Sequence, residues 1–455
     1  MADSGVDEAI ATAEERVPFD PYFSEHGPTE PSPSDAEEPL DPESSTASES
    51  QLETSDEAAP DGPVGWEKRQ KADRRKGSIT VDNIPHVPPN LDDYRPLFWK
   101  SLYVEANGFV QVDLINDLKP IKNLFSFPPS TIPFTNDYSV QDGGYILLGP
   151  SSRISARRTR FGASLYTPAP RFSQGTRLFF EMDFSGIDGA PNVRHAFVAW
   201  PNVILGRTDS VFKDSDAEPE TVDPAGPNAI FGTKQNGLRF VLPIEDYNLA
   251  VSVENTGGII TPTGVSSTSD RLTSNLDYGM HLRGNEEWGH FQVSGIVRNL
   301  RTEDFGPRNQ AFTGFGLALS GQVYTGEKDN HQFAVVYGNG IGSLISDLAG
   351  TNSEVGFNSQ GQLGTQKAFG TYLAYQHWWD ESSRSTLYGS YVDVGVRSGQ
   401  PPTTYKRGTK VGLNFYRTFS KHLSWGTEYA LGSRTNFDGE SRSASRLQTM
   451  IRYRF

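Results

Sequence analysis

The chain has 455 residues, no cysteine and a formal net charge of −15, and 35% of its residues are hydrophobic. No segment approaches the roughly 18 consecutive apolar residues of a membrane-spanning helix, which excludes a helical membrane protein. A membrane barrel is not excluded, because its strands alternate and average out as polar. The absence of cysteine excludes disulfides and thiolate metal sites.

The negative charge is concentrated in residues 1–65, which hold 18 Asp or Glu and one Arg, whereas the rest of the chain holds 38 Asp or Glu and 40 Lys or Arg. The composition of residues 1–65 predicts a disordered acidic tail rich in Ser and Pro, because the segment has too little apolar surface to offset the entropy of ordering. Its candidate partners are periplasmic or cell-wall components. Acidic residues follow Met1 directly, so no signal peptide is visible. Either the sequence begins after cleavage or the chain is not exported.

Residues 66–101 predict a linker that is basic over 66–76 and contains several prolines after that. The basic part is either solvated or in contact with anionic lipid, peptidoglycan or the acidic tail.

Residues 102–455 predict an all-β, antiparallel, up-and-down transmembrane barrel, because amphipathic segments alternate with turns to the end of the chain. Sixteen segments are expected, at 102–113, 152–166, 175–187, 192–200, 202–208, 229–243, 248–255, 275–284, 287–299, 309–325, 330–339, 366–379, 383–396, 407–419, 421–432 and 444–455. Short and long connections largely alternate, which is typical of outer-membrane barrels. The connections 167–174 and 188–191 fit this alternation less well.

The polar faces of these segments indicate a water-filled lumen. Arg177, Glu181 and Asp183 share one face of segment 175–187, and apolar residues share the other. Repeated charged groups cannot be packed into a dry core without partners. Glu181 and Asp183 are therefore expected to be acidic residues of a pore wall. The alternative is the solvent face of an ordinary soluble sheet.

The connection 209–228 is the candidate constriction of the pore. It carries six acids, namely Asp209, Asp214, Asp216, Glu218, Glu220 and Asp223. If it folds into the lumen, its carboxylates would oppose wall arginines and create a transverse field that sorts solutes by charge. The arginines expected opposite it are Arg160, Arg239, Arg283 and Arg298. The alternatives are a solvated surface loop or a calcium site made of carboxylates.

The last segment ends on Phe455 and is apolar on one face, with aromatic residues suited to a membrane interface. Its other face carries Arg446, Arg452 and Arg454. These three are candidate wall charges, with loop 209–228 as their counterpart.

No enzyme motif is present, since the chain has no HExxH pair, nucleophile elbow or phosphate loop. Glu181 and Asp183 could suggest glycoside hydrolysis, but two acids at this spacing are common on any wet strand. We therefore expect no catalysis, no cofactor and no nucleic-acid partner.

Four sequence blocks resemble those of DcaP-like outer-membrane porins. Residues 155–162 (Ser-Ala-Arg-Arg-Thr-Arg-Phe-Gly) resemble the family's Ala-Arg-x-Ser-Arg-x-Gly, and 193–197 (Val-Arg-His-Ala-Phe) resemble its Leu-Arg-His-Ala-Tyr. Residues 217–227 (Ala-Glu-Pro-Glu-Thr-Val-Asp-Pro-Ala-Gly-Pro) are similar to its Leu-Pro-Glu-Thr-Leu-Asp-x-x-Gly-Pro. Residues 289–300 contain its Gly-His-x-Gln-x-x-Gly-x-x-Arg pattern.

The resemblance implies a sixteen-stranded trimeric barrel that passes small, often anionic, solutes such as dicarboxylates. It also implies that Arg194, His195 and Glu220 lie near the pore. Arg207 stands where the family's Gly-Gln-Thr run has Gln, which would add positive charge there. The acidic tail is not a feature expected of the family.

The sequence thus predicts an outer-membrane porin for passive, charge-sorted diffusion, embedded in bilayer and lipopolysaccharide. Two alternatives are a soluble or surface-attached carbohydrate-binding protein, and a structural envelope tether. Solute, pore radius and the tail's partner are left open.

Overall fold

The computed structural model describes residues 102–134, 150–167, 175–255, 259–260, 271–303 and 310–455. The predicted acidic tail and linker lie outside the described residues. Among the residues that are described, no helix is both long and apolar enough to cross a bilayer.

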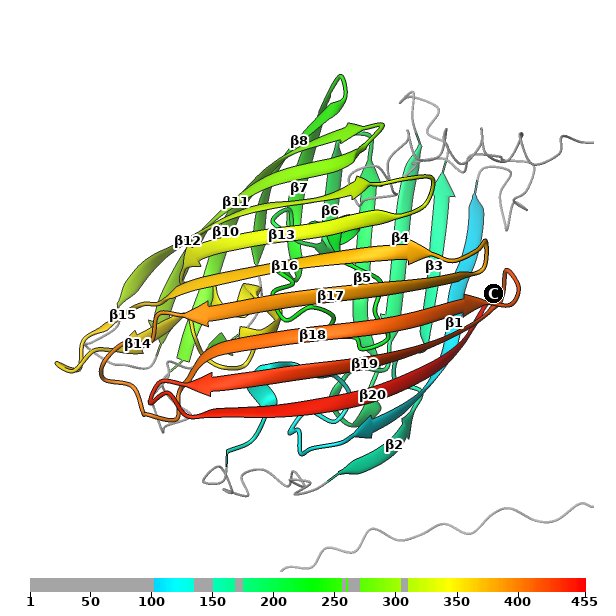
Figure 1. Cartoon of the computed structure of the whole chain (residues 1–455). Coiled ribbons are helices and arrows are strands. Elements are labelled where there is room, and N and C mark those ends of the chain that lie inside the picture. The colour runs from blue at the N-terminus through cyan, green and yellow to red at the C-terminus, as the bar shows by residue number, and fades with distance from the viewer. Residues whose placement is uncertain (1–101, 135–149, 168–174, 256–258, 261–270, 304–309) are drawn as a thin grey trace, which may run out of the picture. The chain divides into compact units, whose positions relative to one another are not determined.

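The described strands form one closed antiparallel barrel with sixteen wall positions, as the sequence predicted (Figure 1). The first and last strands, β1 and β20, pair from Phe109↔Arg454 to Asp117↔Arg446 and so close the wall. Two wall positions are each shared by two strands, because β1 pairs with both β2 and β3 and β10 pairs with both β8 and β9. The wall strands are β1 (Tyr103–Asp117), β2 (Ser151–Ser155) with β3 (Arg160–Thr167), β4 (Thr176–Asp183), β5 (Asn192–Trp200), β6 (Val203–Asp209), β7 (Lys234–Ile244), β8 (Tyr247–Asn255) with β9 (Ile259–Ile260), β10 (Arg271–Glu286), β11 (Gly289–Glu303), β12 (Ala311–Tyr324), β13 (Asn330–Asn339), β16 (Lys367–Trp378), β17 (Ser383–Val394), β18 (Tyr405–Thr418), β19 (Leu423–Asn436) and β20 (Ser441–Arg454).

The connections contain only short elements within the described ranges. A small hairpin joins β14 (Val355–Phe357) to β15 (Leu363–Thr365). The 3-10 turns are η3 (Pro129–Thr131), η4 (Ile187–Gly189), η5 (Ser215–Ala217), η7 (Gly342–Leu344) and η8 (Ser346–Leu348).

Two predicted boundaries differ from the structure for local reasons. The segment predicted at 152–166 is interrupted, because Thr159 N donates to Ala156 O in a turn between β2 and β3. The segment predicted at 229–243 begins only at Lys234, because the residues before it belong to an inner loop in which Phe231 forms a bridge with Ile345.

The wall strands turn apolar side chains outward and polar side chains inward. On β10, Tyr278 and Met280 are 54% and 52% exposed, whereas Arg283 is 1% exposed. The same alternation on β20 leaves Ile451 exposed and buries Arg446. An apolar exterior belongs in lipid, since such side chains gain nothing from contact with water.

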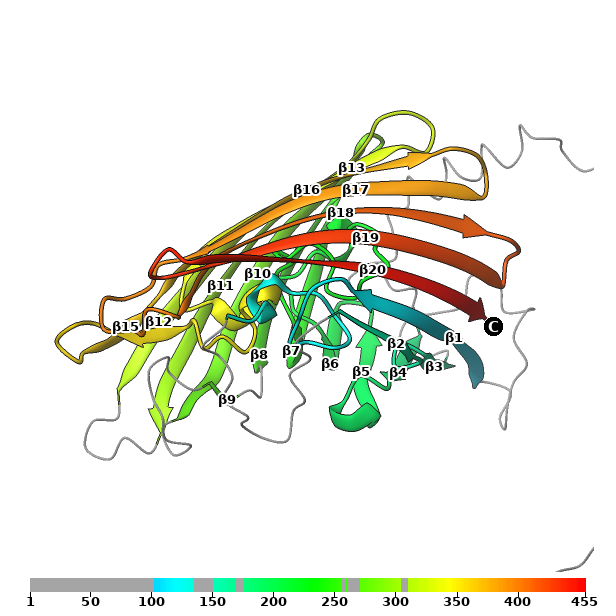
Figure 2. The same cartoon turned by 60° about the horizontal axis from the view of Figure 1, so that its bottom comes forward.

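The wall is uneven in height. β4, β5 and β6 have 8, 9 and 7 residues, whereas β10 and β11 have 16 and 15. At about 3.3 Å per residue, the short strands extend roughly half as far as the long ones. Figure 2 shows the short strands next to one another on one side of the barrel.

The tight turns gather at one end, which we call the short-turn mouth, together with the start of β1 and the end of β20. One of these turns depends on Gly289, which has φ +145° and whose added Cβ would lie 1.9 Å from Gln322 O. Only glycine fits that approach.

Candidate functional site

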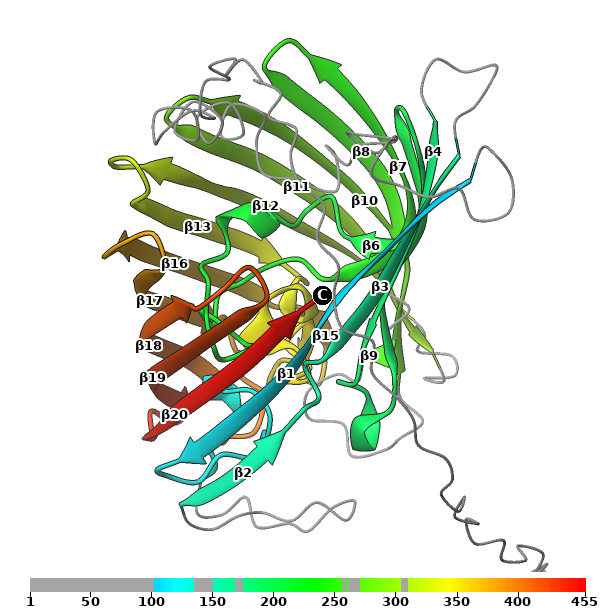
Figure 3. The same cartoon turned by 90° about the vertical axis from the view of Figure 1, so that its right-hand side faces the viewer.

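Three segments fold against the inner face of the wall (Figure 3). They are residues 118–134, the inner loop (residues 209–233) and residues 340–366. Phe212 and Phe231 of the inner loop are buried, with ring centroids 5.3 Å apart, and they pack against wall residues such as Val336. Gly316 and Gly370 of the wall leave room for Phe212 and Ala229 of the loop. The loop therefore lies against the wall from β10 to β19 and is not free in the lumen.

All six predicted constriction acids form ion pairs. Asp209 pairs with Lys234 at 2.8 Å, and Glu218 pairs with Lys213 at 2.9 Å. The other pairs reach the wall: Asp214 to Arg283 and His290 at 3.1 Å each, Asp216 to Arg283 at 2.7 Å, Glu220 to Arg384, and Asp223 to Lys410. The carboxylates therefore attach the loop to the wall that it covers.

This arrangement corrects the expected partners of the loop. Arg283 pairs with its carboxylates, but Arg160 pairs with Glu181 at 3.7 Å and Arg298 pairs with Asp277 at 3.2 Å. Arg239 lies 3.9 Å from Glu254, and it donates to Asp209 O of the inner loop. The expected loop carboxylates and wall arginines do not face each other across open lumen. They form ion pairs with groups on the same side of the barrel.

Burial and charge shift the pKa of the anchoring acids. Burial alone would raise the pKa of Asp214, but the hydrogen bond and charge of His290 and the charge of Arg283 hold it well below its usual range. The pKa of Asp223 is lowered in the same way: burial opposes ionisation, and Lys410 and Arg446 outweigh it. Both acids therefore remain ionised at neutral pH.

Wall carboxylates in turn hold the backbone of the loop. Glu254 accepts from Val211 N at 2.7 Å, and Glu428 accepts from Val222 N at 2.6 Å. Near Glu428, Asp223 also accepts from Phe127 N at 3.1 Å. This last contact ties the inner loop to segment 118–134.

Asp347 joins all three inward segments. Its carboxylate accepts from Ser130 N at 2.8 Å, Asn228 Nδ2 at 2.9 Å and Tyr405 OH. Burial raises the pKa of Asp347 despite these hydrogen bonds, and none of the described ion pairs involves it.

Water reaches the inner surface on the side of β3, β4 and β5. The side chains of Arg160, Arg194 and Glu181 are 27%, 22% and 18% exposed, whereas those of Arg298 and Lys410 are 0% exposed. The open lumen therefore runs along β3 to β5, opposite the loop-covered wall.

A β-bulge places two consecutive basic residues on this open side. The register shifts between Glu181 and Met182, so that Arg194 is the extra residue of β5. Arg194 contacts Glu181 at 2.9 Å and Asp183 at 3.0 Å. His195 remains inward-facing, with Nδ1 3.0 Å from Thr208 Oγ1.

Arg207 is not a pore-wall residue. Ile204 and Thr208 of β6 are buried inward, so strict alternation puts Arg207 on the outer face with Leu205, which is 47% exposed. Its Nε donates to Val193 O at 3.0 Å. The family resemblance implied positive charge near the pore at Arg207, but it could not show which face of β6 carries this side chain.

The arginine side chains of β20 bind mainly to residues of the neighbouring strand β1 and not to the inner loop. Arg446 Nε donates to Asp117 at 2.7 Å, and Arg452 Nε donates to Gln111 at 2.8 Å. The loop's actual wall partners Lys410 and Arg384 were missed, although Lys410 occupies an inward position of β18.

Four cations near the open lumen have no carboxylate ion pair within the described part of the chain: Arg158, Lys421, Arg452 and Arg454. Arg158 instead donates to Val222 O of the inner loop. Charges of Arg158 and Arg454 act on Arg452, so these groups lie close together. These cations without a carboxylate ion pair therefore lie between the β2–β3 turn and the end of β20.

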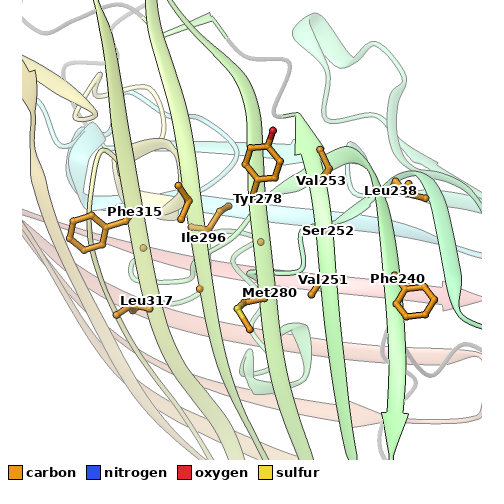
Figure 4. A pocket seen from close by; sticks show the side chains of 14 residues that line it. Leu238, Phe240, Val251, Ser252, Val253, Tyr278, Met280, Ile296, Phe315 and Leu317 are labelled. Carbon is orange, nitrogen blue, oxygen red and sulfur yellow. The ribbon is translucent and has the colours of Figure 1, made fainter.

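A hollow of about 720 Å³ lies elsewhere, on the outer face over β7 to β12. Figure 4 shows its lining, which includes Phe240, Met280 and Leu317. These are lipid-facing side chains, so the hollow does not belong to a solute path. Across the described ranges, no cluster of three or more His, Asp or Glu is placed to hold a metal ion.

Comparisons with known proteins agree with this architecture. The family model described as DcaP outer membrane protein matches residues 104–455. The crystal structure of the outer membrane channel DcaP of Acinetobacter baumannii superposes with a TM-score of 0.66 at 20% identity, covering 78% of this chain and 98% of that one. An anion-selective porin from Comamonas acidovorans has a TM-score of 0.53 at 13% identity, covering 78% and 100%. The search of curated proteins finds no match.

Proposed function

The chain belongs to the DcaP outer membrane protein family, and from that premise we propose that it is a passive channel that favours small anionic solutes. The channel lies in the outer membrane, and its wall separates lipid from a wet interior. Family membership excludes the alternative of a soluble carbohydrate-binding protein.

The observation that carries the anion preference is the distribution of unpaired charge. All six acids of the inner loop are paired, and Glu181 and Asp183 are paired with Arg194. Arg158 and Arg452 have no such carboxylate among the described residues. A passing anion therefore meets a positive potential that Glu220 of the inner loop cancels only in part.

The proposed mechanism needs no bound cofactor and no chemical step. The solute gradient drives movement, the inner loop limits size, and the arginines raise the local concentration of anions. Small dicarboxylates suit this site, because two carboxylates can contact two guanidinium groups at once.

We also propose that the short wall of β4 to β6 faces the centre of a homotrimer. Strands of 7 to 9 residues fall at or below the roughly 9 to 11 residues needed to cross a bilayer. Neighbouring copies would shield this wall from lipid.

The test is reversal potential in planar bilayers under a KCl gradient. The wild-type protein is expected to prefer chloride, and Arg158→Gln with Arg452→Gln is expected to reduce that preference about threefold or more. Arg442→Gln is the matched control, because that arginine is exposed at the opposite mouth and pairs with Glu440.

Cation preference in the wild type, or equal selectivity in the double variant and the control, would overturn the anion proposal. Heat-dependent gel mobility in SDS with no measurable conductance would instead favour a structural envelope tether.

A further inference from the structure

A small basic pocket lies inside the short-turn mouth, lined by residues of β17, β18, β19 and β20. Figure 1 shows the ends of these strands side by side. Its volume is about 70 Å³. The charged or titratable residues that line it are Glu220, Arg384, Tyr416, Lys421, His422, Arg452 and Arg454.

The pocket carries an uncompensated positive charge. Glu220 is its only acid, and both carboxylate oxygens of Glu220 already bind Arg384. Lys421, Arg452 and Arg454 then have no carboxylate partner in the described part of the chain. Three like charges around so small a volume repel one another unless an anion lies between them.

The lining is held in place before any ligand arrives. Arg452 donates to Gln111 and lies 4.6 Å over the ring of Phe109. His422 stacks on Tyr453 at 5.7 Å, and its Nδ1 donates to Arg454 O at 2.8 Å.

We propose that this pocket binds a small multivalent oxyanion, of the size and charge of inorganic phosphate or a short dicarboxylate. The pocket shares Arg452 with the proposed anion path and lies at the short-turn mouth, which is the periplasmic end in outer-membrane barrels. Its role as the last binding site before an anion leaves the pore rests on the proposed channel function, but the binding itself does not.

The test uses the absence of cysteine, which makes any introduced thiol unique. Ser424 lines the pocket and is the register partner of Arg452. In full-length Ser424→Cys, the rates of modification by anionic and cationic methanethiosulfonates are measured, each divided by the rate of a neutral one. Thr325→Cys is the control, because Thr325 is exposed in another turn at the same mouth.

The anionic-to-cationic rate ratio is expected to be about tenfold higher at position 424 than at 325. Adding Lys421→Gln and Arg454→Gln should remove most of that difference. Millimolar inorganic phosphate should slow the anionic reagent at 424 but not at 325, and a parallel series with succinate decides which oxyanion binds more tightly.

Equal ratios at the two positions, or equal protection by phosphate at both, would overturn the proposal. Thr418→Cys, which also lines the pocket, replaces Ser424→Cys if that variant loses heat-dependent gel mobility. A charged pocket in a protein without conductance would keep this proposal and reject the channel, whereas conductance without the rate difference would do the reverse.

Discussion

Lys410→Met should release one end of the inner loop into the lumen. Lys410 is 0% exposed and pairs with Asp223, which is 1% exposed, as is the neighbouring Glu428. Removing the ammonium leaves the buried Asp223 close to the buried Glu428, with Arg446 as its remaining nearby cation. Breaking one partner of a buried ion pair costs about 3–5 kcal/mol, and each 1.4 kcal/mol is a factor of ten in population. The ratio of wall-bound to released conformations of this segment should therefore fall by about two to three orders of magnitude.

The effect should depend on pH with a definite sign. In the wild type the pKa of Asp223 is lowered, so its anchoring is present at neutral pH and is lost only as pH falls through that lowered pKa. Without Lys410, only Arg446 and the backbone hydrogen bonds still oppose the effect of burial, so the pKa of Asp223 should rise from its wild-type value. Acidification from pH 7.5 to about 5 should then neutralise the carboxyl and reseat the loop in the variant, while the wild type stays unchanged.

The assay is single-channel recording at both pH values. Single-channel conductance and current noise of the variant should both be higher than in the wild type at pH 7.5, and the current noise should fall at pH 5. Lys410→Met with Asp223→Asn should be quieter at pH 7.5 than Lys410→Met alone, because one buried charge is gone. Arg442→Gln is the control for charge removal. Wild-type conductance in Lys410→Met, or identical behaviour of the single and double variants, would refute this account.

Two further predictions concern other anchors. Arg283→Lys should loosen the loop near η5 almost as much as Arg283→Gln. Two guanidinium nitrogens of Arg283 bind Asp214 and Asp216 separately, and one ammonium group cannot replace both. Limited proteolysis of the inner loop measures this effect, and full protection in the lysine variant would contradict it. Asp347 should make the packing of segment 340–366 more stable at low pH, because its pKa is raised and the stability is lost as pH rises through that pKa. Hydrogen exchange of residues 342–349, corrected for intrinsic pH dependence, should show this trend in the wild type and not in Asp347→Asn.

The barrel, its strand number and the inward or outward face of most wall residues could be predicted from the sequence. Lipid outside and water inside act on each strand separately, so the alternation in β10 or β20 can be read without knowing any neighbour. The same logic marked loop 209–228 as unusual, because six acids in one connection require partners or water.

The ion-pair partners of the six acids in connection 209–228 became clear only from the three-dimensional fold. Asp223 and its partner Lys410 are 187 residues apart, and their meeting depends on where the loop crosses the tilted wall. A bulge in β5 turns Arg194 inward, and the alternation of β6 turns Arg207 outward, although the family resemblance implied positive charge near the pore at both positions. Local patterns cannot specify such placements, because a shift of one residue in register exchanges the two faces of a strand.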